Sequence, residues 1–435
     1  MGRRQLALVP VLAALAALAG PPARAQVAVV EVGDALPGIG LVFAIEDVAV
    51  DDGGSWMVRV NTDNPAIPRV VLVDGAVALA DGQFLPDANT VLNGFADVDL
   101  EGQLGSLLGV GADIGAFVGD ELVLREGDPC TAPELSPGTV YLGFSACRSG
   151  GAGLLALRGT VEDPALTGLS ERMIAVLHVD GGGRVLSQSV ALFEGMAVGS
   201  TTLSQVGTSP VGWDVNASGA VISTGRVSAP VNQQEAVVFG DTILAQEGTP
   251  SPIAGYDWLS LHAAVSVDDS GRTAFVGSLG GDGGSLLVRD GDKVVQTGDP
   301  LPLDDDLSFG GFGTGPIGLG NNGNLLYHGS WSGAPLNENT ALFLNDRMAV
   351  REGTTAIGGS RVNELVSAPG GYDLSPDGEW LIFRASLDDG TVGAYLMEIG
   401  PWVSTGHGLA GTDGRTPALV GAGSLVPGSA GSLAL

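Results

Sequence analysis

The residues best suited to chemistry in this chain are acidic, and three of them are consecutive. Asp304, Asp305 and Asp306 follow a Pro-Leu corner. Adjacent carboxylates suit calcium, a hard cation that prefers oxygen ligands. Their spacing matches no EF-hand loop, and a solvated acidic loop is the simpler interpretation. We therefore treat the three aspartates as weak metal candidates, with calcium as the ion they would bind.

Histidines give no catalytic or metal-binding pattern. His178, His262, His328 and His407 are far apart in the sequence, and none belongs to an H-x-H or H-E-x-x-H motif. No local signature of Ser-His-Asp chemistry occurs either. The sequence predicts no catalytic residue and no cofactor.

The chain has two cysteines, Cys130 and Cys147. In an exported protein an even cysteine count indicates a disulfide, and with two cysteines only one pairing within the chain can form. We expect a Cys130–Cys147 disulfide, with two buried free thiols as the alternative.

The net charge of the chain limits the classes of partner that it is expected to bind. The chain has 49 acidic against 19 basic residues and a formal net charge of −30. A surface this acidic repels nucleic acid and anionic membranes, so neither is an expected partner. The simplest explanation of the negative charge is that the acidic residues keep an exported β protein soluble.

The first 25 residues have the features of a secretory signal. Arg3 and Arg4 precede an apolar run, Leu6–Ala19, and the sequence Ala23-Arg24-Ala25 is a cleavage site of the A-x-A type. We predict cleavage after Ala25 and a mature chain in the periplasm or outside the cell. No later apolar stretch approaches the roughly 20 residues of a membrane-spanning helix.

One phrase recurs along the rest of the chain. It consists of an apolar strand, a polar two-residue turn, a second strand and a corner glycine after a small or acidic residue. ALFLNDRMAVREG at Ala341–Gly353 is one copy, and AVVFGDTILAQEG at Ala236–Gly248 is another. The corner glycines are Gly33, Gly82, Gly127, Gly195, Gly248, Gly298 and Gly353.

The spacing of these glycines predicts the architecture. Most intervals are close to 50 residues, the period of propeller blades with about four short strands each. In the fifth unit we expect strands at Leu261–Val267, Thr273–Leu279, Ser285–Arg289 and Lys293–Thr297. Asn, Asp and Gly separate the first two strands in most units, as tight hairpins require.

The first repeat has only its second half, which suggests how the ring closes. Ala28–Val32 is a lone fourth strand, whereas the last unit has strands at Gly371–Leu387 and Gly393–Ile399 but no fourth strand. Pairing the two ends would leave no open edge. We predict an all-β, seven-bladed β-propeller over residues 26–400, with six or eight blades as alternatives.

The third unit is the irregular one, with 68 residues between Gly127 and Gly195. Its excess over the other units is about the length of the segment from Cys130 to Cys147. We favour an insertion closed at its base by the disulfide. The competing interpretation makes Thr139–Cys147 a regular inner strand and places the extra residues around Glu162–Arg172.

Residues 401–435 are rich in Gly, Ser and Ala and too short to bury a core alone. This segment resembles the opening of a small C-terminal β module found on many exported bacterial repeat proteins, which would here be incomplete. A loosely ordered tail is the alternative.

The repeat phrase, with Pro after several Gly-Asp corners, resembles an uncharacterised group of secreted bacterial β-propellers. Tyr372–Phe383, YDLSPDGEWLIF, is similar to the repeat of TolB-type propellers. Ala49–Trp56, AVDDGGSW, is similar to the Asp-box of sialidase-type propellers, although it lacks the leading Ser. These resemblances imply blade geometry and no activity, because the motifs are structural. The arginine cluster and the Tyr–Glu pair of a sialidase have no recognisable counterpart.

Five tryptophans occur once each in different units, at Trp56, Trp213, Trp258, Trp331 and Trp380. We expect them to pack between blades, with sugar stacking as the alternative. Together the observations favour an exported, monomeric and non-catalytic propeller that binds a protein or a glycan. The alternatives are an exported glycoside hydrolase or lyase with carboxylates at the channel, and a periplasmic assembly partner resembling TolB.

Overall fold

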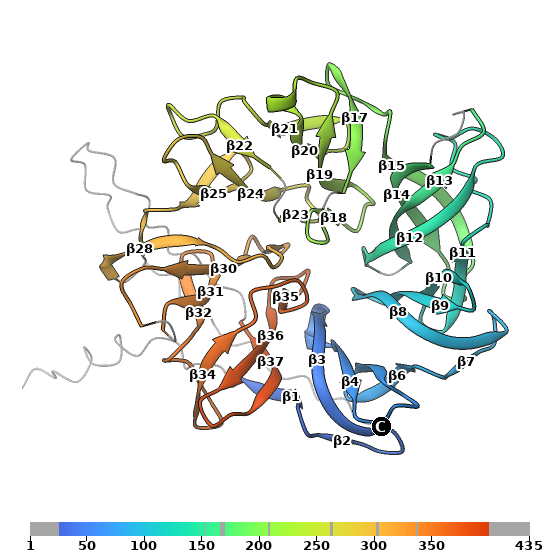
Figure 1. Ribbon diagram of the computed structural model, residues 1–435, viewed down its shortest axis with the longest axis horizontal. Coiled ribbons are helices and arrows are strands. Elements are labelled where there is room, and N and C mark those ends of the chain that lie inside the picture. The colour runs from blue at the N-terminus through green and yellow to red at the C-terminus, as the bar shows by residue number, and fades with distance from the viewer. Residues whose placement is uncertain are drawn as a thin grey trace, which may run out of the picture. The chain divides into compact units, whose positions relative to one another are not determined.

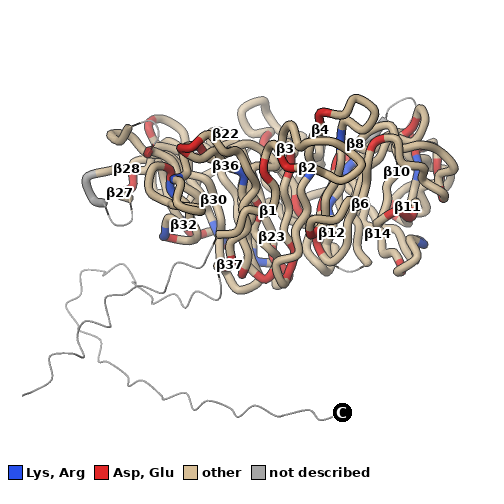
Figure 2. Tube along the Cα trace, turned by 90° about the horizontal axis from the view of Figure 1, so that it is seen from below, with Lys and Arg blue, Asp and Glu red and all other residues tan. Residues whose placement is uncertain are grey.

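The computed structural model describes residues 26–399, apart from 152, 166–169, 208, 262–263, 302–303 and 336–337. Seven antiparallel sheets surround a central channel and form a seven-bladed β-propeller (Figure 1). Seen from the side the ring is flat, and Asp and Glu occur along both of its faces (Figure 2). The predicted signal peptide and the segment 401–435 lie outside the described residues.

In the first two blades the strand nearest the channel is long and continuous. Blade 1 contains β2 (Ala35–Leu36), β3 (Gly40–Val50), β4 (Trp56–Thr62), β5 (Arg69–Val73) and β6 (Ala76–Ala80). Blade 2 contains β7 (Phe84–Leu85), β8 (Thr90–Leu100), β9 (Leu104–Val110), β10 (Asp113–Val118) and β11 (Glu121–Arg125).

Blade 3 has four long strands and no short outer hairpin. They are β12 (Val140–Ser149), β13 (Leu154–Glu162), β14 (Ser170–Val179) and β15 (Val185–Phe193).

In blades 4 to 7 the inner strand is divided into two parts. Blade 4 contains β16 (Ala197–Val198), β17 (Thr201–Val206), β18 (Trp213–Val215), β19 (Val221–Val227), β20 (Glu235–Phe239) and β21 (Thr242–Gln246). Blade 5 contains β22 (Trp258–Ser260), β23 (Val265–Val267), β24 (Thr273–Leu279), β25 (Ser285–Arg289) and β26 (Asp292–Gln296).

Blades 6 and 7 follow the same plan. Blade 6 contains β27 (Pro300–Leu301), β28 (Asp304–Phe312), β29 (Gly318–Leu319), β30 (Leu325–Trp331), β31 (Thr340–Leu344) and β32 (Arg347–Arg351). Blade 7 contains β33 (Ala356–Ile357), β34 (Ser360–Leu365), β35 (Tyr372–Leu374), β36 (Trp380–Leu387), β37 (Val392–Glu398) and β1 (Val27–Glu31). Two short 3-10 turns are η2 (Asp52–Gly54) and η3 (Val231–Gln233).

The predicted ring closure is confirmed. Strand β1 pairs antiparallel with β37, with Val27 opposite Leu396 and Glu31 opposite Gly393. The two strands lie side by side in Figure 1. The N-terminal strand thereby becomes the fourth strand of the last blade, and no edge of the ring is left open at this joint.

The corner glycines explain the repeat phrase. Each has a positive φ, from 72° to 99°, which glycine adopts at little cost. Each also donates its backbone N–H to a carbonyl in the inner strand of the next blade, at 2.7 to 2.9 Å. The acceptor residues are Val42, Leu92, Tyr141, Leu203, Trp258, Phe309 and Val362. The seven corners therefore join seven consecutive blades.

The hairpin between the last two strands is also built on a polar side chain. Asp74, Asp290 and Asn345 have positive φ, and the side chain of each accepts a hydrogen bond from the start of the second strand of its blade. Asn and Asp tolerate this backbone conformation best after glycine. This is the physical reason for the polar turn in the phrase.

The hydrophobic core lies between the blades. Ile222 and Val237 of blade 4 are buried in one cluster with Val265 and Phe275 of blade 5, and five further joints have equivalent clusters. Trp213, Trp258 and Trp331 are almost fully buried. The predicted packing role of the tryptophans between blades is confirmed for these three.

The expected disulfide is absent, and both cysteines are buried free thiols. The N–H of Cys130 donates to the carbonyl of Thr139, so Cys130 lies beside the start of β12. Cys147 lies eight residues further along, or roughly 25 Å at the rise of a strand. A disulfide needs Cα atoms within about 7 Å, so the two residues cannot be bridged.

The insertion closed by that disulfide is also wrong, and the competing interpretation is closer to the structure. Residues 140–149 form the regular inner strand β12. The additional length of the unit lies mainly in the longer strands β13 to β15 and in the connections between them.

Candidate functional site

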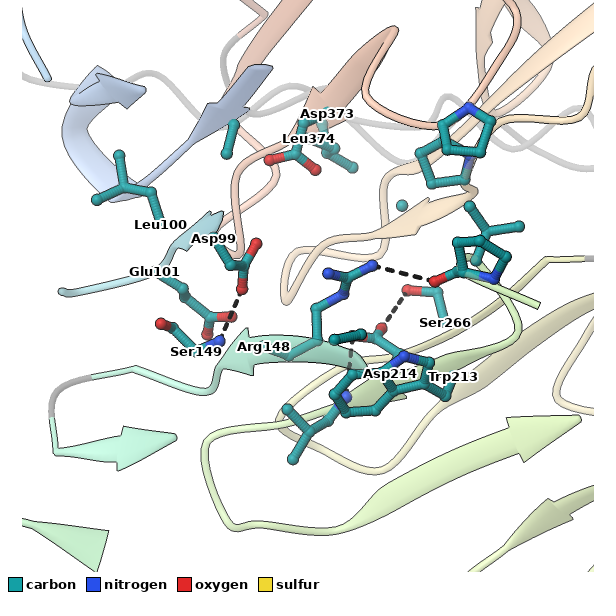
Figure 3. A pocket seen from close by; sticks show the side chains of 18 of the residues that line it. Asp99, Leu100, Glu101, Arg148, Ser149, Trp213, Asp214, Ser266, Asp373 and Leu374 are labelled. Atoms are coloured by element: carbon teal, nitrogen blue, oxygen red, sulfur yellow. Dashed lines mark hydrogen bonds between the residues drawn. The ribbon is translucent and has the colours of Figure 1, made fainter. Parts of the chain in front are cut away.

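A cavity of about 380 Å³ occupies the central channel, and one position of each inner strand lines it. In six blades this position directly precedes an apolar residue that leads into the first hairpin turn, and in blade 3 it precedes Ser149. Its occupants, in blade order, are Ala49, Asp99, Arg148, Asp214, Ser266, Gly318 and Asp373. Three carboxylates and one guanidinium therefore share a single ring (Figure 3).

The carboxylates in this ring join neighbouring blades. Asp99 accepts a hydrogen bond from the N–H of Ser149 at 2.7 Å. Asp214 accepts one from the N–H of Val267 at 2.9 Å. Each donor lies in the inner strand of the following blade, so these side chains satisfy backbone groups that would otherwise face the channel.

Asp373 does the same at the joint where the ring closes. It accepts a hydrogen bond from the N–H of Val50 at 3.0 Å. Ser266 extends the pattern, because its hydroxyl accepts from the N–H of Leu319 at 3.1 Å and donates to Asp214 at 2.9 Å. Polar side chains thus connect four of the joints through one recurring contact.

Arg148 is the exception in the ring. Its guanidinium donates to the carbonyls of Cys147 and Pro210 and lies over the ring of Trp213, 5.4 Å from the centroid. Asp97 lies 3.7 Å from Nη1 of Arg148 and also accepts the N–H of Cys147. Although burial lowers the pKa of Arg148, the carboxylates of Asp99 and Asp97 raise it above its ordinary value. Arg148 is therefore a permanent cation in the channel.

Desolvation raises the pKa values of the channel carboxylates. Burial raises the pKa of Asp373 to about 7 and those of Asp47 and Asp214 to about 6. For Asp47 the neighbouring charge of Arg59 opposes this effect. Burial also raises the pKa of Asp99, and that of Glu101 well above its usual range. Several of these groups therefore change charge between about pH 5 and 8.

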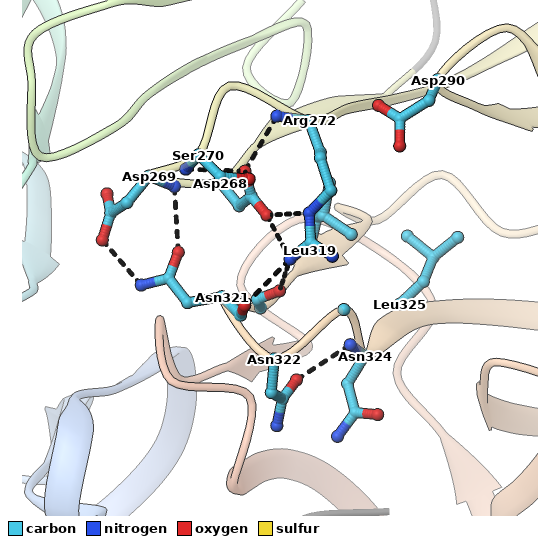
Figure 4. Close-up of polar contacts among 12 residues, drawn as sticks. Asp268, Asp269, Ser270, Arg272, Asp290, Leu319, Asn321, Asn322, Asn324 and Leu325 are labelled. Atoms are coloured by element: carbon cyan, nitrogen blue, oxygen red, sulfur yellow. Dashed lines mark hydrogen bonds and ion pairs between the residues drawn. The ribbon is translucent and has the colours of Figure 1, made fainter. Parts of the chain in front are cut away.

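A second set of polar contacts lies at the hairpin turns, and Figure 4 shows those between blades 5 and 6. Asn321 and Asp269 form reciprocal contacts: the backbone N–H of Asp269 donates to Oδ1 of Asn321 at 2.9 Å, and Nδ2 of Asn321 donates to the Asp269 carboxylate at 2.6 Å. Asp269 also accepts the N–H of Ala217 at 2.8 Å, and Asp52 accepts the N–H of Asp377 at 2.7 Å. Asp52 and Asp269 in these turns therefore connect neighbouring blades.

Asp268 organises its own turn. It accepts the backbone N–H groups of Ser270 and Arg272 and pairs with the Arg272 guanidinium, which also donates to the carbonyl of Asn321 in the next blade. Although burial acts in the opposite direction, these hydrogen bonds hold the pKa of Asp268 below its usual range.

The structure leaves the predicted metal candidates untested. The backbone of Asp304–Asp306 opens β28, but these side chains lie outside the described part of the chain. Within the described residues no group of three or more His, Cys, Asp and Glu side chains could hold a metal ion. His178 is exposed on β14 and His328 is buried in β30, whereas His262 and His407 fall outside the described residues.

Sequence reasoning did not identify the channel residues Asp99, Arg148, Asp214 and Asp373. The available signal was the recurrence of Asp before Val or Leu just ahead of a hairpin turn, in VDL, WDV and YDL. In the described residues no helix has the length and hydropathy of a membrane span.

No protein-family model matches the chain, and no curated protein matches its sequence. Solved structures do match. A subtype N11 neuraminidase-like protein of A/flat-faced bat/Peru/033/2010 (H18N11) is 10% identical with a TM-score of 0.30, over 87% of this chain and 95% of that one. BBS1N in complex with ARL6DN is 8% identical with a TM-score of 0.33, over 87% and 99%.

Trypanosoma rangeli sialidase in complex with sialic acid is 12% identical with a TM-score of 0.31, over 88% of this chain and 60% of that one. Likenesses of this strength carry no argument about what this chain does.

Proposed function

We propose that this protein is an exported binding module without chemistry of its own, which acts as a monomer and whose partner is a protein or a glycan. The main support is how the channel carboxylates are used. Asp99, Asp214 and Asp373 each accept a backbone N–H of the following blade. A catalytic acid or base must exchange protons with the substrate, whereas these groups hold the ring together.

A ring closed in this way is a rigid platform. The inner strands are joined by side chains at the channel, and the corner glycines join the same blades further out. Loops on a rigid scaffold are the usual place for recognition, so we expect the partner to bind loops on one face of the ring.

Thermal melts of the full-length protein test this proposal. The protein is melted alone and with calcium, EDTA and a panel of neutral and acidic glycans. A rise of several degrees with one additive means preferential binding to the native state, and we expect it with one class of glycan. A flat response across the panel contradicts the glycan form of the proposal and leaves a protein partner, which pull-down with exported proteins then tests.

One observation favours a second candidate, an exported glycoside hydrolase or lyase. Asp373, Asp214 and Asp47 have pKa values of about 6 to 7 and line one cavity. Groups that titrate near neutrality are suited to general acid–base catalysis. In this function Asp373 would be the acid, and release of reducing ends from polysaccharides is the assay.

A periplasmic assembly role like that of TolB is the third candidate. Only the blade motif at Tyr372–Phe383 favours it, and this motif shapes a turn: Ser375 and Asp377 hydrogen bond to each other and to the following backbone.

A further inference from the structure

A second cavity, of about 450 Å³, lies between blades 3 and 4 and has a different character from the channel. Residues of β12, β13, β14 and β17 line it, and two of them are the arginines Arg158 and Arg172. Arg158 also lines the channel cavity, together with Arg59, Arg148 and several carboxylates. Among the described residues that line the second cavity there is no Asp or Glu, on a chain with 49 acidic and 19 basic residues.

The strand register places both arginines on the same face of blade 3. Thr160 lies opposite Arg172 in the β13–β14 pair, and Arg158 is two residues before Thr160. Side chains two residues apart in a strand share a face. Ala156 and Ile174, further along that face, pack against Leu203 of blade 4. The guanidinium groups therefore face the joint with blade 4.

Arg158 is fixed in place by the protein itself. Its Nη1 donates to the carbonyls of Gly207 at 3.2 Å and Ser209 at 2.8 Å, and its Nε donates to the hydroxyl of Ser145 at 3.0 Å. Gly207 permits this path, because a Cβ there would lie 2.7 Å from Cδ of Arg158. Within the described residues Nη2 of Arg158 has no hydrogen-bond partner, and it is left for a ligand.

Arg172 contributes an exposed guanidinium beside it. Several other arginines form ion pairs with carboxylates, as in Arg69–Asp81 and Arg125–Asp113. In the part of the chain that the structure describes, the guanidinium groups of Arg158 and Arg172 form no such pair. Burial lowers the pKa of Arg158, and the positive charges of Arg148 and Arg172 lower it further. An anion in the cavity would relieve this repulsion.

Three carboxylates act near the site but are used or placed elsewhere. The charge of Asp97 raises the pKa of Arg158, but Asp97 accepts the N–H of Cys147 and lies beside Arg148. Glu194 accepts the backbone N–H of Arg172 at 3.3 Å. Glu126 approaches Gly143 at the edge of the cavity, where its Oε1 would lie 3.4 Å from a Cβ of that glycine. The positive groups that face the cavity thus remain available to a ligand.

We propose that this cavity binds an acidic sugar through its carboxylate, with a hexuronate unit of an anionic glycan as the ligand. A guanidinium matches a carboxylate in planar, two-bond geometry. The Thr160 hydroxyl beside Arg172 could bond a sugar hydroxyl, and the volume is in the usual range for small-molecule sites. This inference deepens the proposed binding function, since it names the chemistry of the partner.

Calorimetric titration of the full-length protein with galacturonate and glucuronate oligosaccharides tests the proposal. Neutral oligosaccharides of the same length, inorganic sulfate and poly-glutamate serve as comparison ligands. We expect binding of a uronate oligosaccharide only, weakened at least tenfold by Arg172→Gln and to a smaller degree by Thr160→Val. Arg184→Gln, at an exposed arginine in the β14–β15 turn of the same blade, is the matched control and should bind like the unmodified protein.

Three results overturn the proposal: no binding of any uronate, equal binding of sulfate or poly-glutamate, or equal losses in Arg172→Gln and Arg184→Gln. None of these three results contradicts the more general proposal of a binding module, which holds if another glycan or a protein binds. Cleavage of a polysaccharide would instead contradict the proposed non-catalytic function. The comparison of uronate binding by Arg172→Gln and Arg184→Gln would still test the cavity. Far-ultraviolet circular dichroism of each variant separates lost binding from lost folding.

Discussion

Val50 and Asp373 are separated by 323 residues in the sequence, yet the N–H of Val50 donates to the Asp373 carboxylate at 3.0 Å. This contact joins the inner strands of the first and last blades. The same carboxylate is desolvated, which raises its pKa to about 7. It therefore holds the ring together and, when ionised, also strains it electrostatically.

Asp373→Asn should stabilise the protein at alkaline pH. A carboxyl group with a raised native pKa favours folding below its unfolded pKa, and this contribution is lost as the pH rises through the native value. For Asp373 the loss is about 4 kcal/mol at most by pH 8. Asparagine keeps an oxygen for Val50 N–H and has no charge. We expect urea denaturation to show a more stable variant at pH 8.

The same comparison near pH 4 should show little difference between the two proteins, because Asp373 is then protonated in the native state. Asp346→Asn, at an exposed turn residue, is the control and should change stability little at either pH. A destabilised Asp373→Asn at pH 8 would contradict the assigned electrostatic strain.

His328 should act in the opposite direction. Its ring is buried beside Tyr372, with centroids 6.4 Å apart, and in the described residues neither ring nitrogen has a hydrogen-bond partner. Burial lowers its pKa to about 4. The unfolded chain takes up a proton near pH 6.5 and the native protein only near pH 4. Stability is therefore lost as the pH falls through this window, by about 3 kcal/mol at most.

His328→Phe should remove this acid sensitivity. The difference in unfolding free energy between the variant and the unmodified protein should grow in favour of the variant from pH 7 to pH 4. His178→Gln, at the exposed histidine of β14, is the control for removing a histidine that is not buried. A constant difference across this range would show that His328 is protonated alike in both states.

The closing strand offers a matched pair of valines. Val30 is 4% exposed and packs in the cluster between blades 7 and 1, whereas Val27 is 57% exposed. Val30→Ala should cost about 1–3 kcal/mol through lost burial and the cavity left behind. Val27→Ala should change stability by less than about 0.5 kcal/mol. Equal effects in thermal or urea unfolding would mean that β1 does not close the ring in solution.

The two thiols should resist alkylation until the protein unfolds. Cys130 and Cys147 are buried, and burial, with Asp97 as a further cause, raises the pKa of Cys147 well above its usual value. A protonated, inaccessible thiol is a poor nucleophile. Without reductant, intact mass should show two alkylations in urea and none in buffer. If the unfolded chain is alkylated in urea only after reduction, the two cysteines form a disulfide and the assignment as free thiols is wrong.

Much of the scaffold is readable from local sequence. The expected strands Thr273–Leu279 and Ser285–Arg289 coincide with β24 and β25. These strands end at hairpins and corners whose residues are set by backbone conformation, so type and spacing are sufficient. The expected strand Leu261–Val267 is only partly correct, because β22 ends before Leu261 and β23 begins only at Val265. The inner strand of this blade is divided into β22 and β23, and Leu261–Val267 contains no Gly or Pro at which to expect a division.

The channel site depends on contacts that only ring closure creates. Locally, Asp214 and Asp373 are marked only by a following Val or Leu ahead of a hairpin turn, and their raised pKa values come from burial in the folded ring. Arg148 occupies the same strand position as these aspartates, but the irregular third unit concealed the alignment. The expected disulfide was wrong for a related reason. It rested on the match between the excess length of the third unit and the Cys130–Cys147 segment, but the segment runs along β12 and so separates the two cysteines.

Polysaccharide cleavage by the unmodified protein and by Asp373→Asn tests the central claim most directly, namely that the channel carboxylates join blades and do not react. Reducing-end release is measured from pH 4 to pH 8 on neutral and acidic polysaccharides, with circular dichroism to confirm that both proteins are folded. We predict no release above buffer by either protein on any substrate. Cleavage by the unmodified protein that Asp373→Asn abolishes, with its fold intact, would contradict the account and assign the channel to a hydrolase or lyase.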